Sequence, residues 1–376
     1  MERSDDVLVV GGGPAGLTAA SLLAGCGLSV SVLERELGPE GGVAVLTRSA
    51  VEILTAAGVE TSRFESPAMK YKRLELRAAR DAVGLHLGER SILAMHRTDL
   101  VDKLRDTASK RGARVLCGFR ATRPEWEERR ITGIRARDPD GKERLFGARA
   151  VVDASGAAMF IAGALGQAQP RTGPRREVLS GWEDGAPNPA EVLELWPGER
   201  WLVVGSGTPS PVIILERSQV HGGIRRAAAS EFSLRQIRRI RGAGALTRAQ
   251  AGEGWVAVGS AAGRAAPLAP GATGVGLETA AAAAWEIPLS LEKGRHLAAS
   301  QVGATVTLAR QAVHLESLLA RGLEQASEGG WLQRAAATPF RRKHLTASLL
   351  GEWSPKRGRL AQTYYLWWLA RGRARR

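Results

Sequence analysis

Residues 7–35 read VLVVGGGPAGLTAASLLAGCGLSVSVLER. The stretch opens with four apolar residues in a row, which favours a strand buried on both faces. A turn with the spacing G-x-G-x-x-G follows, at Gly11, Gly13 and Gly16, and then come a run of helix formers and a second apolar run that ends on Glu34. Strand, glycine turn, helix, strand and acid in this order form the βαβ pattern that binds a dinucleotide.

Each part of this pattern has its own physical role. The first glycine makes the tight turn, the second lets a pyrophosphate approach the main chain, and the third lets the helix pack on the strand. The helix N-terminus presents unpaired N–H groups to the phosphates, and the acid accepts hydrogen bonds from an adenosine ribose. An acid here disfavours a 2′-phosphate, so FAD or NAD fits better than NADP, an argument that the neighbouring arginine weakens slightly. The predicted binding residues of this first part are Gly11, Gly12, Gly13, Pro14, Ala15, Gly16, Glu34 and Arg35.

Further glycine turns follow apolar runs downstream. Residues 150–157 read AVVDASGA, and residues 254–263 read GWVAVGSAAG. A proline- and glycine-rich loop at 267–276 then precedes an alanine-rich helix that we expect to end near Trp285. We expect these turns at the carboxyl end of one sheet, as a second wall around an extended cofactor. The N-terminus of the alanine-rich helix is suited to stabilising negative charge on a reduced flavin.

With these motifs the chain resembles the FAD-dependent oxidoreductases of the para-hydroxybenzoate-hydroxylase superfamily, also called the glutathione-reductase-2 type. The resemblance rests on GGGPAG with Glu34, on Arg97-x-x-Leu100, on VVDASGA, and on VGSAAG with the loop after it, and it spans roughly the first 300 residues. It implies one tightly bound FAD and no separate nicotinamide domain. It also implies further FAD-binding positions at Arg97, Asp153, Gly156, Gly259, Ser260, Gly271, Ala272, Thr273 and Gly274. Arg48, where the family often has an arginine near the flavin, is the weakest candidate.

Two positions depart from that family. Ser260 stands where the family usually has an aspartate that holds the ribityl chain, and Gly263 stands where its hydroxylases often have a histidine. A serine hydroxyl can still bond the ribityl chain, but without charge. The GSAAG run followed by a proline is more similar to the branch with flavin halogenases, geranylgeranyl reductases and flavoproteins that oxygenate peptidyl tryptophan. The halogenase signature Trp-x-Trp-x-x-Pro does not occur in the chain, which disfavours halogenation.

The sequence therefore predicts an α/β fold: a Rossmann-like FAD-binding domain with an inserted β-rich substrate domain and a helical C-terminal region. We expect the FAD-binding domain at 1–170 and 250–300, the substrate domain at 171–249, and the helical, basic region at 301–376. Residues 70–90 are expected to add to the substrate sheet. Trp182, Trp196 and Trp201 are candidates for an aromatic substrate pocket, although packing in the core or on the sheet is the more common role for each of them alone.

Side chains that carry acid–base or metal chemistry are sparse. His86 lies on an expected substrate strand and is a weak candidate for an acid or base. No histidine pair has metal-ligand spacing with an acid or cysteine nearby, so no metal is expected. The two cysteines lack metal or redox spacing, no signal peptide precedes the first strand, and no apolar run reaches the ~20 residues of a membrane span. We expect a cytoplasmic location, with peripheral membrane contact as an alternative.

Positive charge is concentrated in two segments outside the motifs. The chain carries a formal net charge of +15. Residues 334–376 hold eleven bases and one acid, and residues 216–248 hold eight bases and two acids. The chain ends in TYYLWWLARGRARR, where Tyr364, Trp367 and Trp368 share a helical face. This tail fits docking on the core, contact with an anionic membrane surface, or binding of an acidic protein or peptide. No nucleic-acid partner is expected, because no nucleic-acid module is recognisable.

The function expected from these features is an FAD-dependent monooxygenase. It would hydroxylate or epoxidise an electron-rich aromatic or unsaturated substrate, either a small molecule or a peptide, with tryptophan-derived substrates among the candidates. Electrons would come from NAD(P)H or from a separate flavin reductase. The first alternative is a flavin-dependent reductase or dehydrogenase of an isoprenoid-like C=C bond at a membrane surface. The others are a flavin halogenase and a non-catalytic, flavoprotein-like partner protein.

Overall fold

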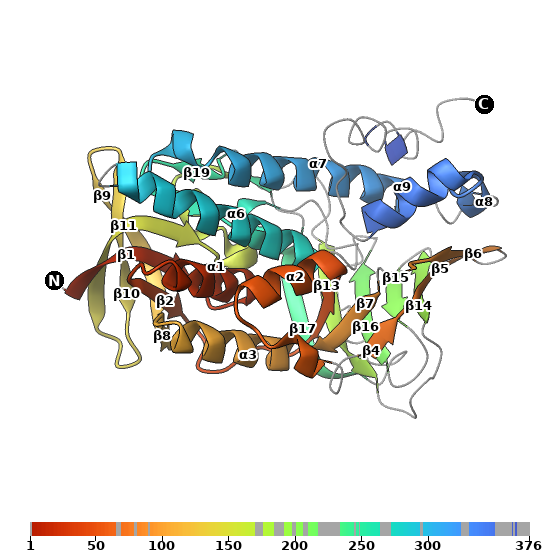
Figure 1. Cartoon of the computed structure of the whole chain (residues 1–376), viewed down its shortest axis with the longest axis horizontal. Coiled ribbons are helices and arrows are strands. Elements are labelled where there is room, and N and C mark those ends of the chain that lie inside the picture. The colour runs from red at the N-terminus through yellow and green to blue at the C-terminus, as the bar shows by residue number, and fades with distance from the viewer. Residues whose placement is uncertain are drawn as a thin grey trace.

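Two large sheets, two small sheets and a set of long helices are described in the computed structural model (Figure 1). The long helices pack mainly on one face of the larger sheet, its antiparallel strands fold over much of the other face, and the second sheet lies beside it. The structure describes residues 2–64, 69–78, 81–88, 91–169, 176–183, 192–197, 201–205, 210–216, 234–243, 246–247, 249–263, 272–293, 296–324, 331–349, 363 and 365–366.

The larger sheet has the strand order β19-β20-β11-β1-β2-β8, and β10 and β9 continue it from β11. β1 runs parallel to β2 and β11, β2 parallel to β8, and β11 parallel to β20. The chain therefore leaves β1 in both directions, and β1 is a topological switch point of the kind where doubly wound sheets bind ligands. This confirms the Rossmann-like α/β prediction. The strands are β1 (Glu2–Val10), β2 (Val30–Glu34), β8 (Arg114–Cys117), β9 (Arg120–Glu127), β10 (Arg130–Arg137), β11 (Glu143–Asp153), β19 (Ala251–Gly252) and β20 (Trp255–Ala257).

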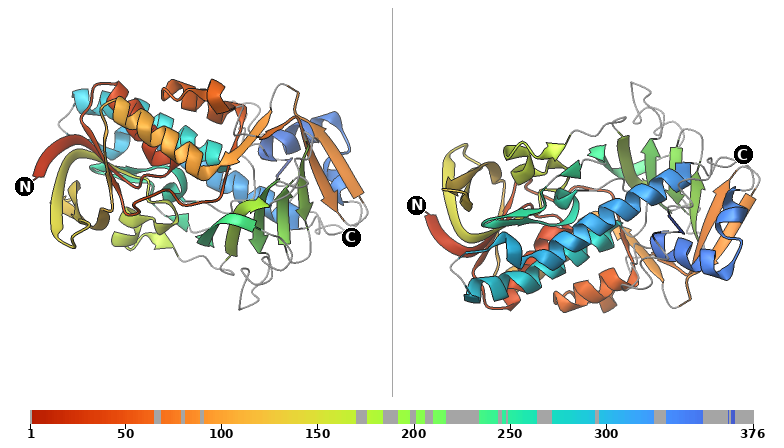
Figure 2. Two further views of the ribbon diagram at one scale, coloured as in Figure 1. Left: turned by 90° about the horizontal axis from the view of Figure 1, so that it is seen from below. Right: turned by 90° about the horizontal axis from the view of Figure 1, so that it is seen from above.

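The helices pack in layers on this sheet, as the two further views show (Figure 2). α1 packs against both α3 and α6, and α6 packs against α7 and α2. The α-helices are α1 (Pro14–Gly25), α2 (Arg48–Ala56), α3 (Arg97–Lys110), α4 (Phe160–Ala164), α6 (Ala272–Lys293), α7 (Gly303–Glu324), α8 (Trp331–Ala335) and α9 (Pro339–Leu349). The 3₁₀ turns are η1 (Thr61–Phe64), η2 (Gly156–Ala158), η3 (Gly259–Ala262) and η4 (Ala299–Gln301).

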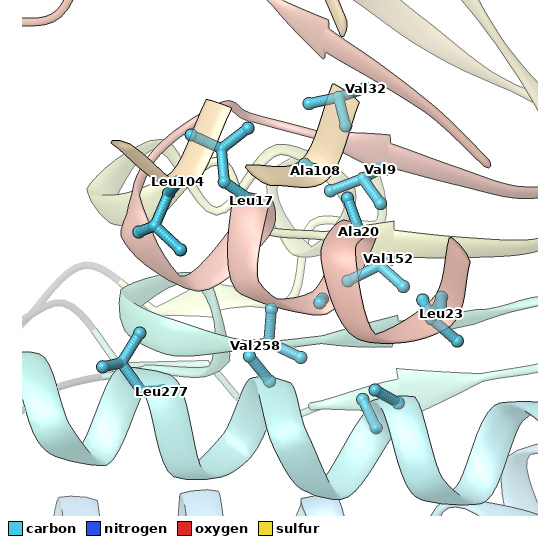
Figure 3. Close-up of a cluster of buried hydrophobic side chains, with 14 of the residues drawn as sticks. Val9, Leu17, Ala20, Leu23, Val32, Leu104, Ala108, Val152, Val258 and Leu277 are labelled. Carbon is cyan, nitrogen blue, oxygen red and sulfur yellow. The ribbon is translucent and has the colours of Figure 1, made fainter. Parts of the chain in front are cut away.

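The core between sheet and helices is made of aliphatic side chains with almost no solvent exposure. Val9 of β1, Leu17 and Leu23 of α1, and Val258 and Leu277 on the α6 side belong to one buried cluster (Figure 3). Each such side chain gains about 1.5–3 kcal/mol from burial. This packing holds the start of α1 against the ends of the strands, where the glycine turn lies.

Two element boundaries differ from the sequence prediction. β1 begins at Glu2 rather than at Val7, because its first residues also pair with β11. α6 does not end near Trp285 but continues through Pro288 to Lys293. The missing N–H of a proline weakens a helix, but Ile287 and Leu291 on either side are buried and anchor the last turns to the core.

The second sheet has seven strands in the order β17-β13-β16-β15-β14-β5-β6. Residues 73–86 thus pair into the same sheet as strands from 176–243, through the parallel pair β14 and β5. β3, β7 and β4 form a three-stranded sheet, β12 and β18 form a two-stranded one, and β3 contacts β13 and β16. The domain boundaries themselves stay a prediction. The strands are β3 (Val43–Leu46), β4 (Met69–Tyr71), β5 (Arg73–Ala78), β6 (Asp81–His86), β7 (Ile92–His96), β12 (Ala168–Gln169), β13 (Arg176–Glu183), β14 (Val192–Pro197), β15 (Trp201–Gly205), β16 (Ser210–Glu216), β17 (Leu234–Ala243) and β18 (Leu246–Thr247).

Part of the tail packs on the last helices. The Tyr365 hydroxyl donates to the carbonyl of Ala335 at 2.8 Å, and its ring centroid lies 6.1 Å from that of His344. Burial raises the pKa of Tyr365 and lowers the pKa of His344, because both would have to carry charge away from water. Tyr365 and Leu366 are thus docked on the protein, whereas Tyr364, Trp367 and Trp368 lie outside the described residues. Among the described helices, none is long and apolar enough to cross a membrane.

Candidate cofactor site

A cavity of about 410 Å³ opens at the carboxyl ends of β1, β2, β11 and β20. Its position is the switch point of the sheet, and its size falls in the range of small-molecule sites. Twelve of the residues predicted from sequence line it: Gly11, Gly12, Gly13, Pro14, Ala15, Glu34, Arg35, Arg97, Gly156, Gly259, Ser260 and Thr273.

The three motif glycines are needed for different reasons. Gly11 has a φ of +108°, and a Cβ there would lie 2.5 Å from the carbonyl oxygen of Ala154. A Cβ on Gly16 would lie 2.0 Å from the carbonyl oxygen of Gly11, so this glycine lets α1 begin close to the turn and does not line the cavity. Both glycines are required by the fold itself.

Gly13 is not required by the fold. Its φ of −77° and ψ of 178° suit any residue, and an added Cβ would meet only Nη2 of Arg97, at 3.6 Å. The space in front of this main chain belongs to the cavity. It fits a group that must approach the backbone closely at the N-terminus of α1, as a dinucleotide pyrophosphate does. The residues present therefore fit FAD at this position.

The Glu34 carboxylate holds the glycine turn to the end of β2. The main-chain N–H of Gly12 donates to its Oε2 at 2.6 Å, and the N–H of Glu36 donates to its Oε1 at 2.9 Å. A carboxylate has about four acceptor positions, so two stay available for the hydroxyls of a ribose. The role predicted for Glu34 is compatible with these bonds.

Two of the four arginines that line the cavity among the described residues, Arg97 and Arg35, were predicted from the sequence. Arg97 opens α3, and its Nη1 donates to the carbonyl of Glu40 at 3.0 Å, while its Nη2 faces Gly13. This places a guanidinium beside the proposed pyrophosphate position. Arg35 forms an ion pair with Glu36 at 3.0 Å and approaches Glu40 at 3.9 Å. These glutamates share the charge of Arg35 and reduce its attraction for a further phosphate such as the 2′-phosphate of NADP.

Asp153 is not among the residues that line the cavity, and its expected contact with the cofactor stays a prediction. Its carboxylate is fully buried and accepts from the N–H of Ser155 at 3.0 Å and of Ile161 at 2.8 Å. Burial raises its pKa, and the hydrogen bonds oppose that rise only in part. Asp153 therefore holds the turn after β11, and that turn lines the cavity through Ala154, Ser155, Gly156, Ala158 and Phe160.

The opposite wall comes from η3 and the start of α6. Gly259 has a φ of +60°, and a Cβ there would lie 2.9 Å from the Cβ of Ala15. Its N–H donates to the hydroxyl of Thr279 on α6 at 2.9 Å. Ser260 and Thr273 present hydroxyl groups to the cavity from these two elements. The distant glycine turns thus close around the same space as the first one.

Several other predicted positions lie elsewhere. Gly274 is buried, and a Cβ there would lie 3.1 Å from Oγ1 of Thr47, so it packs under the wall. Arg48 does not line the cavity and forms an ion pair with Glu52 at 3.0 Å. His86 is exposed on the edge strand β6 and does not line the cavity either. Gly271 and the side chain of Ala272 lie outside the described residues.

The side chains of the three candidate pocket tryptophans also lie outside the described residues. Their backbone positions are described. Trp196 pairs with Val203, which is two residues from Trp201, so these two tryptophan positions share one face of the sheet. Trp182 pairs with Pro211, whose position belongs to the other face. An aromatic pocket made by all three stays a prediction.

Sequence reasoning missed some lining residues. Phe119 and Arg120 follow β8, and the N–H of Phe119 donates to the carbonyl of Glu34 at 2.9 Å. Because β8 is the parallel neighbour of β2, the switch-point rule already points to this loop. No local sequence pattern marked Arg105 on α3 or Phe160 on α4 as residues that line the cavity. Among the described residues, no three His, Cys, Asp or Glu side chains lie together as metal ligands.

Three solved structures and one group of curated proteins are similar to this chain. The fold is similar to a flavoprotein/dehydrogenase from Cytophaga hutchinsonii (TM-score 0.80, 18% identity, 96% of each chain). It is also similar to the flavin-dependent brominase Bmp2 (0.78, 15% identity, 96% of this chain and 97% of that one). A geranylgeranyl bacteriochlorophyll reductase-like protein from Thermoplasma acidophilum matches as well (0.73, 16% identity, 93% and 97%).

The curated relatives match over shorter stretches. A thiamine thiazole synthase from Solidesulfovibrio magneticus is 41% identical over 69 residues, which are 16% of this chain and 26% of that protein. Other synthases of this kind are matched over 44% and 55% of their length. The chain thus spans between about a quarter and about half of the curated relatives it matches.

The stretch that matches a family model includes the glycine turn, Glu34, Arg97 and the turn after β11. The family described as "FAD binding domain" matches residues 4–235, which is more than half of the chain. The chain belongs to this FAD binding domain family of flavin-dependent enzymes.

Proposed function

We propose that the chain is an FAD-dependent monooxygenase whose organic substrate is held between the cofactor cavity and the seven-stranded sheet. One observation carries this proposal. Val43 and Ala44 of β3 line the cavity, and the same strand contacts β13 and β16 of the second sheet. A substrate on that sheet therefore lies next to the cofactor site.

The walls of the cavity support chemistry that needs water excluded. Val43, Ala44 and Val258 are buried apolar residues, and the nearby polar groups from η3 and α6 are the hydroxyls of Ser260 and Thr273. When bound, FAD supplies two-electron redox chemistry and the activation of O₂. The apolar part of the wall at Val43, Ala44 and Val258 would keep water from the reacting atoms, which oxygen transfer to an electron-rich substrate requires.

The start of α6 contributes electrostatically. Thr273 lies in the first turn of α6 and lines the cavity. The N-terminus of a 22-residue helix carries a partial positive charge of roughly half an elementary charge, directed at what lies in front of it. This end of α6 stabilises negative charge that develops on a bound group, without any titratable side chain.

The experiment follows the flavin and the fate of oxygen. Purified holoprotein is reduced under anaerobic conditions with NADH, NADPH or a flavin reductase, and then exposed to isotope-labelled O₂ with an indole, a phenol, a tryptophan peptide or an isoprenoid alkene. We expect substrate-accelerated reoxidation of the flavin and one labelled oxygen atom in the product.

Other outcomes assign a different reaction. Reoxidation by an alkene without oxygen would identify a C=C reductase. A product that gains chlorine or bromine in the presence of halide would identify a halogenase. Protein that never binds flavin would leave a partner-binding role and would overturn the proposed activity.

A further inference from the structure

The corner that joins α8 and α9 is unusually exposed. We define the α8–α9 corner as residues 333–343. Ala335 and Ala336 fix it to the protein as buried residues, and Arg341 is half-buried. The remaining side chains are exposed: Gln333, Arg334, Ala337, Thr338, Pro339, Phe340, Arg342 and Lys343.

This corner carries positive charge without acids. Residues 331–349 contain Arg334, Arg341, Arg342 and Lys343, and no Asp or Glu. Three of these cations lie in the first turns of α9, where the partial positive charge of the helix N-terminus adds to theirs and disfavours them. The helix dipole therefore does not account for this placement. Arg341 and Arg342 bond main-chain carbonyls of the corner, whereas the exposed side chains of Arg334 and Lys343 suit an anionic partner.

The corner is also held in one shape. Nη1 of Arg341 donates to the carbonyl of Arg334 at 2.9 Å, and Nε of Arg342 donates to the carbonyl of Ala336 at 2.9 Å. Tyr365 donates to the carbonyl of Ala335, between these two. The cations are thus presented from a backbone that three hydrogen bonds fix.

An exposed aromatic ring stands among these cations. Phe340 is 53% exposed, and its ring makes an edge contact with the ring of His344 at 4.3 Å between centroids. An aromatic ring beside several cations is the combination found at membrane–water interfaces, where the ring enters the headgroup layer and the cations meet anionic lipids. An acidic protein would also meet the cations, and protein interfaces use aromatic rings too, so the test below includes an acidic polypeptide as competitor.

We propose that the α8–α9 corner binds the surface of an anionic lipid bilayer. Charge complementarity and the exposed ring carry the proposal, and the sequence after the corner extends both features. Residues 350–376 hold seven bases, one acid and five aromatic residues, and Tyr365 of this stretch returns to the corner. The proposal does not depend on which reaction the flavin site performs.

The position of the corner determines which part of the protein would face the bilayer. α8 contacts β6, the edge strand of the seven-stranded sheet, and both lie at the end of the molecule opposite to β9 and β10 (Figure 1). A bilayer bound at the corner therefore lies beside the second sheet. A lipophilic substrate would reach that sheet without crossing the adenosine end of the cavity.

Vesicle sedimentation of the full chain tests this proposal. Vesicles of phosphatidylcholine alone are compared with vesicles that contain phosphatidylglycerol, at low and high salt. Cations near an anionic surface each contribute roughly a fivefold factor to binding. We expect binding only to the anionic vesicles, loss of binding at high salt, and about 25-fold weaker binding for the double variant Arg334→Gln/Lys343→Gln. Neither side chain takes part in the hydrogen bonds that fix the corner.

Matched controls come from the β9–β10 hairpin at the other end. Arg123→Gln/Arg129→Gln changes the net charge equally on exposed side chains, and Trp126→Ser removes a partly exposed ring. We expect both controls to bind like the parent protein, and Phe340→Ser to bind more weakly with unchanged flavin content.

Three results would overturn the proposal: no binding of the parent to anionic vesicles, equal losses in the corner and hairpin double variants, or full binding by Phe340→Ser. Complete competition by polyglutamate together with that last result would point to an acidic protein instead.

Discussion

The substitution Gly13→Val tests whether the space in front of Gly13 is used by a bound ligand or by the packing of the protein. Gly13 has backbone angles that any residue adopts, and the nearest atom to an added Cβ is 3.6 Å away. We expect the free energy of unfolding of the apoprotein to change by less than about 1 kcal/mol, because the loss of glycine freedom in the unfolded chain offsets the poorer N-cap. The matched variant Gly16→Ala places a Cβ 2.0 Å from the Gly11 carbonyl, and overpacking of this kind costs about 1–3 kcal/mol or more.

FAD affinity should fall strongly in Gly13→Val, although the stability of this variant hardly changes. A side chain at Gly13 fills the place where phosphate oxygens meet main-chain N–H groups. Losing two charge-assisted hydrogen bonds of about 1.5–3 kcal/mol each weakens binding by about 100-fold to 10,000-fold. The assay is a fluorescence titration of apoprotein with FAD, paired with urea unfolding followed by circular dichroism.

Two results would refute this reasoning. If Gly13→Val binds FAD as tightly as the parent, the pyrophosphate does not lie at this main chain. If Gly13→Val destabilises the apoprotein as strongly as Gly16→Ala, the space in front of Gly13 is not free for a ligand.

Three further predictions concern the cofactor walls and the C-terminal helices. Ser260→Asp should tighten FAD binding roughly fivefold and Ser260→Ala should weaken it, because a charged acceptor bonds a ribityl hydroxyl more strongly than a neutral one; equal affinities in the titration would exclude Ser260 as a contact. Asp153→Asn should cost about 1–3 kcal/mol in urea unfolding and lower FAD affinity, since the amide oxygen can replace only one of the two carboxylate oxygens that accept from Ser155 and Ile161; unchanged stability would contradict that role. Burial lowers the pKa of His344, so the unfolded chain binds the proton more readily, and stability should fall as the pH drops below about 6.5. His344→Gln should flatten the pH dependence between the folded pKa of His344 and about pH 6.5, and a profile equal to that of the parent would contradict the assignment.

The first βαβ unit could be predicted from sequence because its constraints are local. A glycine turn between two buried strands leaves one arrangement of backbone, and Gly11 and Gly16 have the contacts that the pattern requires. Glu34 at the end of β2 lies beside the turn for the same reason, since β1 and β2 are parallel neighbours. The α/β class and the position of the cofactor site follow from this short stretch.

Tertiary structure decided what depends on residues far apart in the chain. Only the fold shows that Asp153 turns inward to hold a loop, that Arg48 pairs with its own helix, and that Phe119 comes to the rim through β8. The same holds for the α8–α9 corner, where Tyr365 returns over 30 residues to bond Ala335. Sequence patterns specify which residues follow one another along an element, whereas the packing of elements decides which side chains share a surface. A dinucleotide site was therefore predictable from one stretch of residues and FAD from the resemblance that the later motifs complete, whereas the shape of the cavity walls was not.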